Sequence, residues 1–170
     1  QVISRTMDIL LALPSILLAI VVVAVLGPSL VNTVISIAIV GLPNMVRLVR
    51  SSVLIEKRKI YVMALKSCGA SWFRIYIVNI LPNCMAPLIV QATFGFSDGI
   101  LNAAALGFLG LGVQPPNPEW GTMLSDSRQY IESAGWLVTL PGLCILIVVL
   151  SFNLLGDGLR DHLDPKSKRV

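Results

Sequence analysis

Residues 136–155 read WLVTLPGLCILIVVLSFNLL, a run of twenty residues that contains no charged side chain. An α-helix needs about 20 mostly apolar residues to cross the hydrocarbon core of a bilayer. The composition of the whole chain agrees, because its 170 residues are 55% hydrophobic and 13% charged. A soluble domain usually carries about 25% charged residues. The sequence therefore predicts a protein that is embedded in a membrane.

Three more stretches have the same apolar character, at residues 9–26, 30–46 and 84–113. Because backbone polar groups cannot stay unpaired in lipid, we expect helices in all four stretches. A membrane β-barrel is excluded, since no ten-residue alternation of apolar and polar side chains is present. We predict an all-α polytopic fold with four spans, kinked at the prolines inside them, Pro14, Pro43 and Pro141.

The basic residues are distributed unevenly between the two predicted sides of the membrane. Of the 13 Lys and Arg residues, only Arg128 falls in the loop between the third and fourth spans, residues 114–135. Cytoplasmic loops of membrane proteins are enriched in Lys and Arg. We therefore predict that the loop 51–82 and the tail 158–170 are cytoplasmic and that the loop 114–135 is external. Within the external loop, TMLSDSRQYIES is expected to form a short surface helix.

The cytoplasmic loop contains YVMALKSCGASWFRIYIVNILPN, residues 61–83. Its apolar spacing predicts a short helix that ends at Gly69, and Ser71 can cap a second helix. Pro82 suits the first turn of the next span. The residues alone leave two interpretations open: an amphipathic helix that rests among lipid headgroups, or a docking element for a cytoplasmic partner.

The pattern Tyr61-Val62, then Gly69-Ala70-Ser71, then Ile-Leu-Pro-Asn resembles the coupling loop of bacterial binding-protein-dependent ABC importer permeases. More narrowly, it is similar to the second permease subunit of dipeptide and oligopeptide importers. The likeness extends over nearly the whole chain, and its other motifs are MDILLALPSILLAIVVVAVLGPSL, RLVRSSVL, LPNCMAPLIVQATFGFSDGILNAAALGFLGLGVQPPNPEWGTML and FNLLGDGLRDHLDP. One motif departs from the family, because its usual Glu-Ala-Ala is replaced here by Met63-Ala64-Leu65, so the acidic residue is absent.

This resemblance implies a type I ABC transmembrane domain over residues 1–157, with four of the family's usual six spans, followed by the tail. It implies a multi-pass protein of the bacterial inner membrane that pairs with a second permease subunit, two ATP-binding subunits and an external binding protein. The chain has no GxxxxGK[ST] phosphate-binding loop. ATP is therefore expected to be bound and hydrolysed by the partner subunits, and no cofactor is expected in this chain. The residues implied in coupling to the ATPase are Tyr61, Val62, Ala64, Leu65, Gly69, Ala70, Ser71 and Trp72.

Three polar residues of the third span are candidates for the lining of a translocation path, Gln91, Asp98 and Asn102. A carboxylate inside a span normally faces protein or a water-filled cavity, and Asp98 could attract the amino group of a peptide. The alternative for Asp98 is a hydrogen bond that packs helices together. The segment GFLGLG, residues 107–112, is expected to serve close helix packing through its small residues.

Other classes of protein are less compatible with the sequence. A membrane-embedded enzyme would need a nucleophile with its base or a set of metal ligands, yet His162 is the only histidine and no HExxH motif occurs. The three cysteines form no CxxC pair, so no metal site is predicted. A channel or secondary transporter would need no ATPase, and the structured loop 61–83 argues against both. The substrate stays open among dipeptides, longer peptides, glutathione, haem and nickel chelates.

Overall fold

The computed structural model describes residues 2–163 of the chain. These residues form helices joined by short connections, with no strand among them, which confirms the predicted all-α class. The elements are α1 (Val2–Leu10), α2 (Ser15–Leu26), α3 (Leu30–Glu56), α4 (Ile60–Ser67), the π-helical segment η1 (Arg74–Ile80), α5 (Leu81–Phe108), α6 (Trp120–Asp126), the 3₁₀ turn η2 (Ser127–Tyr130) and α7 (Trp136–Leu163).

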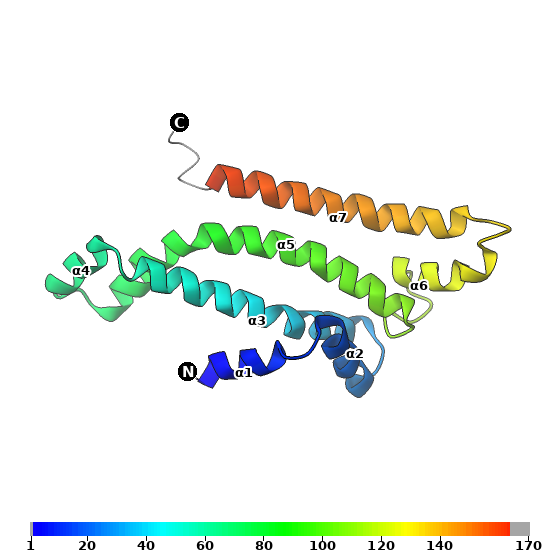
Figure 1. The fold of residues 1–170 in the computed structure, drawn as a ribbon, viewed down its shortest axis with the longest axis horizontal. Helices are drawn as coiled ribbons and strands as arrows, with labels where there is room; N and C mark the ends of the chain where they lie inside the picture. Colours follow the sequence, from blue (N-terminus) through cyan, green and yellow to red (C-terminus); the bar gives the residue numbers. More distant parts are fainter. Residues whose placement is uncertain (1, 164–170) are drawn as a thin grey trace.

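Three long helices lie side by side, with α5 between α3 and α7 (Figure 1). Each is long and apolar enough to cross a membrane, and η1 continues without a break into α5, so that Arg74–Phe108 is one helix of 35 residues. Helix α4 lies at one end of the bundle, and α6 lies at the opposite end against α5 and α7 (Figure 1). These helices coincide with three of the four predicted spans.

The first predicted span, residues 9–26, is not one continuous helix. Helices α1 and α2 meet at an angle of 92° across a short break, although together they are apolar enough for one span. Pro14 precedes α2 at its N-cap position. Proline disfavours helical geometry in the residue before it and has no N–H for a helical hydrogen bond. The predicted kink is therefore a complete break of the helix at Pro14, whereas Pro43 and Pro141 lie inside continuous helices.

The ends of the other spans also differ from the prediction. Helix α3 continues beyond residue 46 to Glu56, and α7 continues beyond residue 155 to Leu163. The third span begins earlier than residue 84, at η1, and its helix ends at Phe108 rather than at residue 113. Charged residues such as Arg, Lys and Glu are themselves good helix formers, so apolar runs underestimate helix length. The tail is helical up to Leu163, and its residues 164–170 lie outside the described part of the chain.

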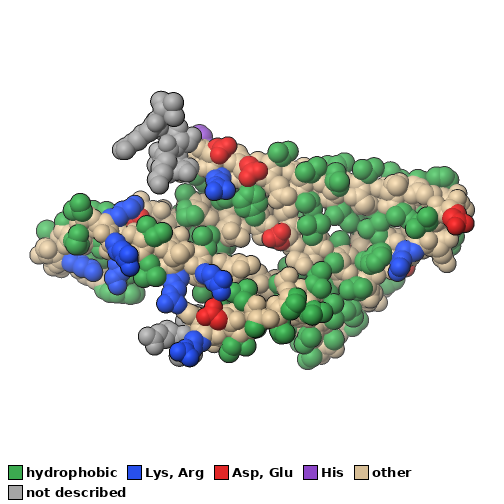
Figure 2. Space-filling view, in the orientation of Figure 1, with side chains coloured by type: hydrophobic (Ala, Val, Ile, Leu, Met, Phe, Trp, Pro, Cys, Tyr) green, Lys and Arg blue, Asp and Glu red, His purple; other side chains and the backbone are tan. Residues whose placement is uncertain are grey.

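Positive charge is concentrated toward one end of the bundle. Lys and Arg side chains gather over α4 and the adjoining parts of α1 and α3, and few are visible at the end that holds α6 (Figure 2). Two polar contacts connect α1 to α3 at this basic end. Arg47 forms an ion pair with Asp8 at 3.1 Å, and Arg50 donates a hydrogen bond to Ser4. Lys166, Lys168 and Arg169, which contribute to the predicted asymmetry, lie outside the described residues.

Few side chains are buried among the described residues, and most of the buried apolar ones belong to two clusters. One cluster joins α2, α3 and α5 around Ala19, Val23 and Leu106. The other cluster joins α4 to η1 and the start of α5 around Val62, Ile75, Ile80 and Cys84. Many large apolar side chains along α5 and α7 are exposed in the single chain, as expected for surfaces that face lipid or another subunit.

Candidate functional site

The turn after α4 has the geometry that the sequence predicts for Gly69. Gly69 adopts φ +71°, the left-handed region that favours glycine. Its N–H donates to the carbonyl of Lys66 at 3.0 Å, and the N–H of Ala70 donates to the carbonyl of Leu65 at 3.0 Å. This pair of bonds is the Schellman motif, which satisfies carbonyls at a helix C-terminus. The turn therefore fixes the direction in which the chain leaves α4.

The second predicted helix of the loop is the beginning of the third span. The Ser71 hydroxyl accepts a hydrogen bond from the Arg74 N–H at 3.4 Å, which agrees with the predicted cap. From Trp72 the helix runs through the π-helical turns of η1 into α5 without a turn at Pro82. The Asn79 side chain donates to the carbonyl of Arg74 at 2.6 Å within η1. The loop is thus mechanically continuous with the helix that carries Gln91, Asp98 and Asn102.

Three of the residues implied in coupling to the ATPase, Tyr61, Val62 and Leu65, pack toward the inside of the loop. Val62 is completely buried, and Tyr61 and Leu65 pack against the same cluster on η1 and α5. Val62 is therefore covered within this chain, whereas Tyr61 and Leu65 are half-buried and keep part of their surface accessible. Their contact with a partner stays a prediction. Their position follows from the size of the loop: two short helices are stable only if they bury apolar surface against each other.

A polar network fastens the same loop to the end of α3. The Tyr61 hydroxyl donates to the Glu56 carboxylate at 2.9 Å, and Lys59 pairs with the same carboxylate at 2.6 Å. The Asn83 side chain donates to the Tyr61 hydroxyl at 3.3 Å. The hydrogen bond from Lys59 to Glu56 raises the pKa of Lys59, and burial raises the pKa of the Tyr61 hydroxyl. The network links α3, α4 and α5 at one point.

Five exposed apolar residues of the loop form what we term the tip surface, which consists of Ile60, Met63, Ala64, Trp72 and Phe73. Ile60, Met63 and Ala64 share one face of α4, since residues three and four apart are neighbours on a helix. Ile60 is 80% exposed, Trp72 is 70% exposed and Phe73 is 63% exposed. The Trp72 ring lies 4.6 Å from the Tyr76 ring, centroid to centroid. The tip surface is apolar and carries no acidic group.

Gln91, Asp98 and Asn102 line one cleft of about 910 Å³ between α3 and α5. Their spacing of seven and four residues places them along one face of α5. The facing wall comes from α3, from Val34 to Met45. The structure therefore brings together the three residues that were predicted to line a path.

Asp98 contributes an unpaired charge to this cleft. No basic side chain among residues 2–163 lies within ion-pair distance of its carboxylate, which is exposed in the single chain. The Asn102 side chain donates to the backbone carbonyl of Asp98 at 2.8 Å and not to the carboxylate. Within the described residues, the Asp98 side chain thus has no helix-packing hydrogen bond of the kind considered as the alternative.

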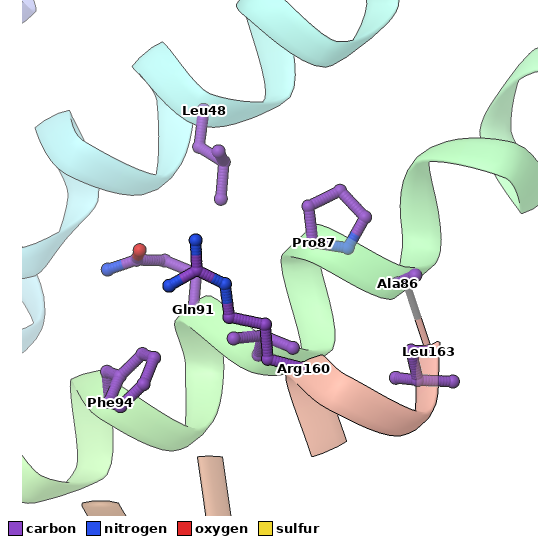
Figure 3. Close-up of a pocket in the computed structure, with 8 residues that line it drawn as sticks. Leu48, Ala86, Pro87, Gln91, Phe94, Arg160 and Leu163 are labelled. Atoms are coloured by element: carbon purple, nitrogen blue, oxygen red, sulfur yellow. The ribbon is translucent and has the colours of Figure 1, made fainter. Parts of the chain in front are cut away.

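A second cleft of about 470 Å³ lies between α3, α5 and α7. It shares Gln91 with the first cleft, and Arg160 of α7 is its charged residue. The guanidinium group extends beside Gln91 toward Leu48 of α3 (Figure 3). Close packing of α7 on α5 brings the helices together here, because Gly156 meets the ring of Phe94. From the sequence, Arg160 was assigned only to the basic tail.

At the other end of the bundle, Glu119 folds back onto the end of α5. One carboxylate oxygen accepts a hydrogen bond from the Val113 N–H at 3.0 Å, and the other is buried without a hydrogen-bond partner among the described residues. A Cβ atom at Gly107 would lie 2.6 Å from this carboxylate, and a Cβ atom at Gly112 would overlap it as well. Gly107 and Gly112 therefore make room for the Glu119 side chain, rather than for a neighbouring helix as predicted, and Gly110 instead adopts φ +77°.

The roles of Glu56, Glu119 and Arg160 were not predicted from the sequence. The spacing of three residues between Glu56 and Lys59 was a usable signal for an ion pair. Glu119 and Arg160 depend on long-range packing and gave no local signal. Among residues 2–163, no group of three or more His, Cys, Asp or Glu side chains is placed to hold a metal ion.

Comparison with known proteins gives one family and several relatives. The family model described as "Binding-protein-dependent transport system inner membrane component" matches residues 1–169. The Di/tripeptide transport system permease protein DppC of Pseudomonas aeruginosa is 65% identical over 168 residues, which cover 99% of this chain and 55% of that protein.

Two further relatives extend the comparison. The Dipeptide transport system permease protein DppC of Escherichia coli K12 is 59% identical, covering 99% of this chain and 56% of that protein. The Glutathione transport system permease protein GsiD of Shigella flexneri is 46% identical, covering 99% of this chain and 55% of that protein. The chain thus spans about half the length of the curated relatives that it matches.

Proposed function

Because the chain belongs to the family of binding-protein-dependent transport system inner membrane components, we propose that it forms part of the translocation path of an ATP-driven peptide importer. The single observation that carries this proposal is the cleft between α3 and α5, in which Gln91, Asp98 and Asn102 face the same space. A cleft with polar groups and one unpaired carboxylate suits a polar, water-soluble solute that must cross between apolar walls. The family membership supports the same proposal, that the chain forms part of a translocation path.

The proposed substrate is a dipeptide or another short peptide. Support comes from the names of the relatives, since the two DppC permeases compared above are 65% and 59% identical to this chain and the glutathione permease is 46% identical. The Asp98 carboxylate would attract the amino group that every unmodified peptide carries. Glutathione, haem and nickel chelates stay alternatives that only a transport assay with each solute separates.

The remaining subunits in this proposal are a second permease, an external binding protein and two cytoplasmic ATP-binding proteins. ATP would be hydrolysed by the last of these, and this chain would transmit the resulting movement. It would lie in the bacterial inner membrane with the α4 end in the cytoplasm, which the concentration of Lys and Arg at that end supports (Figure 2).

The loop around α4 suits the transmission of movement. Its tip surface is exposed and apolar, while Val62 and the Glu56–Tyr61 bond hold it to α5 and α3. A partner that moves Trp72 must move α5 as well, because the helix is continuous from Trp72 to Phe108. Rigid-body displacement of packed helices is a common mode of switching. We therefore assign the tip surface to the ATP-binding partner.

Two tryptophans of similar exposure provide a matched test. Trp72 is 70% exposed on the tip surface, and Trp136 is 62% exposed at the opposite end of the bundle. Trp72→Ala in the intact complex should weaken binding of the ATP-binding subunit by about thirtyfold and so reduce its co-purification, because buried aromatic anchors contribute roughly 2 kcal/mol or more to interfaces. Trp136→Ala should leave it unchanged. Equal retention of the ATP-binding subunit in both variants would contradict the assignment.

A further inference from the structure

Arg160 is the charged residue of a largely apolar cleft. The cleft of about 470 Å³ is lined by Leu48, Phe94, Leu163 and other mainly apolar side chains, and the guanidinium group projects into it (Figure 3). Asp157 and Asp161 flank Arg160 on α7, yet neither forms an ion pair with it, and no other carboxylate among residues 2–163 does so. The positive charge therefore has no counter-charge within the described part of the chain.

A guanidinium group in such surroundings favours an anion with two oxygens. Arginine binds carboxylates and phosphates through two parallel hydrogen bonds, and it remains charged at all physiological pH values. Arg160 is exposed in the single chain, so its guanidinium group is accessible to a solute that enters the cleft. The chemistry of the cleft thus selects a carboxylate or a phosphate, and the neighbouring Gln91 amide adds both donor and acceptor groups.

The position of the cleft decides between these two anions. Gln91 lines both this cleft and the larger one that contains Asp98, so the two spaces meet at Gln91. Asp98 lies seven residues beyond Gln91 on α5, which corresponds to about 10 Å along the helix axis. A negative group and a positive group thus stand at successive positions along one connected space. Such an arrangement suits a small zwitterion, whose ammonium and carboxylate ends meet opposite charges in turn.

We propose that the cleft between α3, α5 and α7 binds the terminal carboxylate of a short peptide, with the Arg160 guanidinium as its counter-charge and Gln91 as a second polar contact. This proposal rests on the proposed function, because it takes the peptide as the solute in the α3–α5 cleft. It adds a recognition site for the carboxylate at the basic end of the path. Asp98 and Arg160 then distinguish the two ends of the peptide.

Protection of a cysteine tests the site directly. Leu48→Cys places a thiol on the wall of the cleft, in an intact complex in which Cys68, Cys84 and Cys144 have been replaced by alanine. The rate of modification by a thiol reagent is measured in nanodiscs with the dipeptide Ala-Ala or with its C-terminal amide. Ala-Ala should slow the modification, and the amide, which lacks the carboxylate, should do so about tenfold less well, since the loss of a charge-assisted bond is typically of this size.

Variants of Arg160 identify the group responsible. In Arg160→Gln the difference between Ala-Ala and its amide should disappear, and in Arg160→Lys, which keeps the charge, much of it should remain. Arg128→Gln, at the opposite end of the bundle, should behave like the parent protein. Equal protection by Ala-Ala and its amide in the parent, or an unchanged difference in Arg160→Gln, would overturn the proposal.

Two further measurements distinguish a peptide site from a lipid site and from a failure of transport. Nanodiscs with and without phosphatidylglycerol show whether a lipid headgroup phosphate occupies the cleft instead, and protection that depends on this lipid and not on Ala-Ala would refute the peptide site. ATP-dependent uptake of Ala-Ala into proteoliposomes is measured in parallel. If uptake persists while protection is absent, the carboxylate site is wrong and the proposed function stands. If uptake itself is absent, the proposed function fails.

Discussion

Replacing Gly69 by valine should open the turn between α4 and the helix that begins at Trp72. Gly69 has φ +71°, and a Cβ atom there would meet nothing within 4 Å, so the whole cost is conformational. A residue with a Cβ loses about 1–2 kcal/mol in this region, and a β-branched residue loses more. Opening the turn instead sacrifices the two bonds at Gly69 and Ala70, at about 1 kcal/mol each. The ratio of closed to open turn should therefore fall by a factor of roughly thirty, since the strain amounts to about 2 kcal/mol.

The series Gly69→Asn, Gly69→Ala and Gly69→Val tests this reasoning in the intact complex. Asparagine tolerates left-handed geometry, so the closed turn should become progressively less stable from the Asn to the Ala to the Val variant, although space is available for all three side chains. Hydrogen exchange at the amides of residue 69 and Ala70 reports the turn, and co-purification of the ATP-binding subunit reports its consequence. Similar exchange rates in the Asn and Val variants would refute the conformational argument, and normal retention of the ATP-binding subunit in Gly69→Val would refute its role in coupling.

Three other predictions follow from the cleft, the outer loop and the charge distribution. Asp98→Asn should lower peptide uptake more than it lowers the amount of protein in the membrane, since the carboxylate lines the cleft without a structural partner among the described residues; equal losses would make it a packing residue. Burial raises the pKa of Glu119 above the usual 4.5, against the opposing Val113 N–H bond, so the docked loop should be most stable at acidic pH and lose hydrogen-exchange protection as pH rises through the raised pKa. Glu119→Gln should flatten that dependence, and an unchanged pH profile in this variant would exclude Glu119 as its source. A membrane-impermeant reagent applied from outside should label Ser125→Cys and not Ser67→Cys in a cysteine-free background, and the reverse pattern would invert the orientation.

The long apolar helices and the turn at Gly69 could be predicted from the sequence. The runs at 30–46 and 136–155, and residues 84–108 of the third run, lie on long helices, because backbone groups in lipid must be hydrogen-bonded within their own segment. Gly69 was readable for a similar reason, since a glycine after a short helical face has a local conformational role. The shared face of Gln91, Asp98 and Asn102 follows from helical periodicity alone.

Features that depend on packing between distant segments could not be predicted from the sequence. Val62 and Leu65 looked suited to a partner because nothing local indicated that η1 and α5 would cover them. Arg160 looked like one more basic residue of a tail until the close contact of Gly156 with Phe94 set α7 beside α5. The position of the break at Pro14 could be predicted from the sequence. The angle between α1 and α2 could not, since a proline can either bend a helix or end it.

The most direct test of the proposed path is to find where a peptide touches this chain during transport. A photoreactive dipeptide would be supplied to proteoliposomes that contain the intact complex with ATP, illuminated during uptake, and its adducts mapped by mass spectrometry. We predict ATP-dependent uptake with adducts at residues 91–103 of α5 and on the facing wall of α3, residues 34–45. Adducts confined to the exposed apolar face of α7 around Leu143 and Leu150, or uptake that does not depend on ATP, would contradict the path.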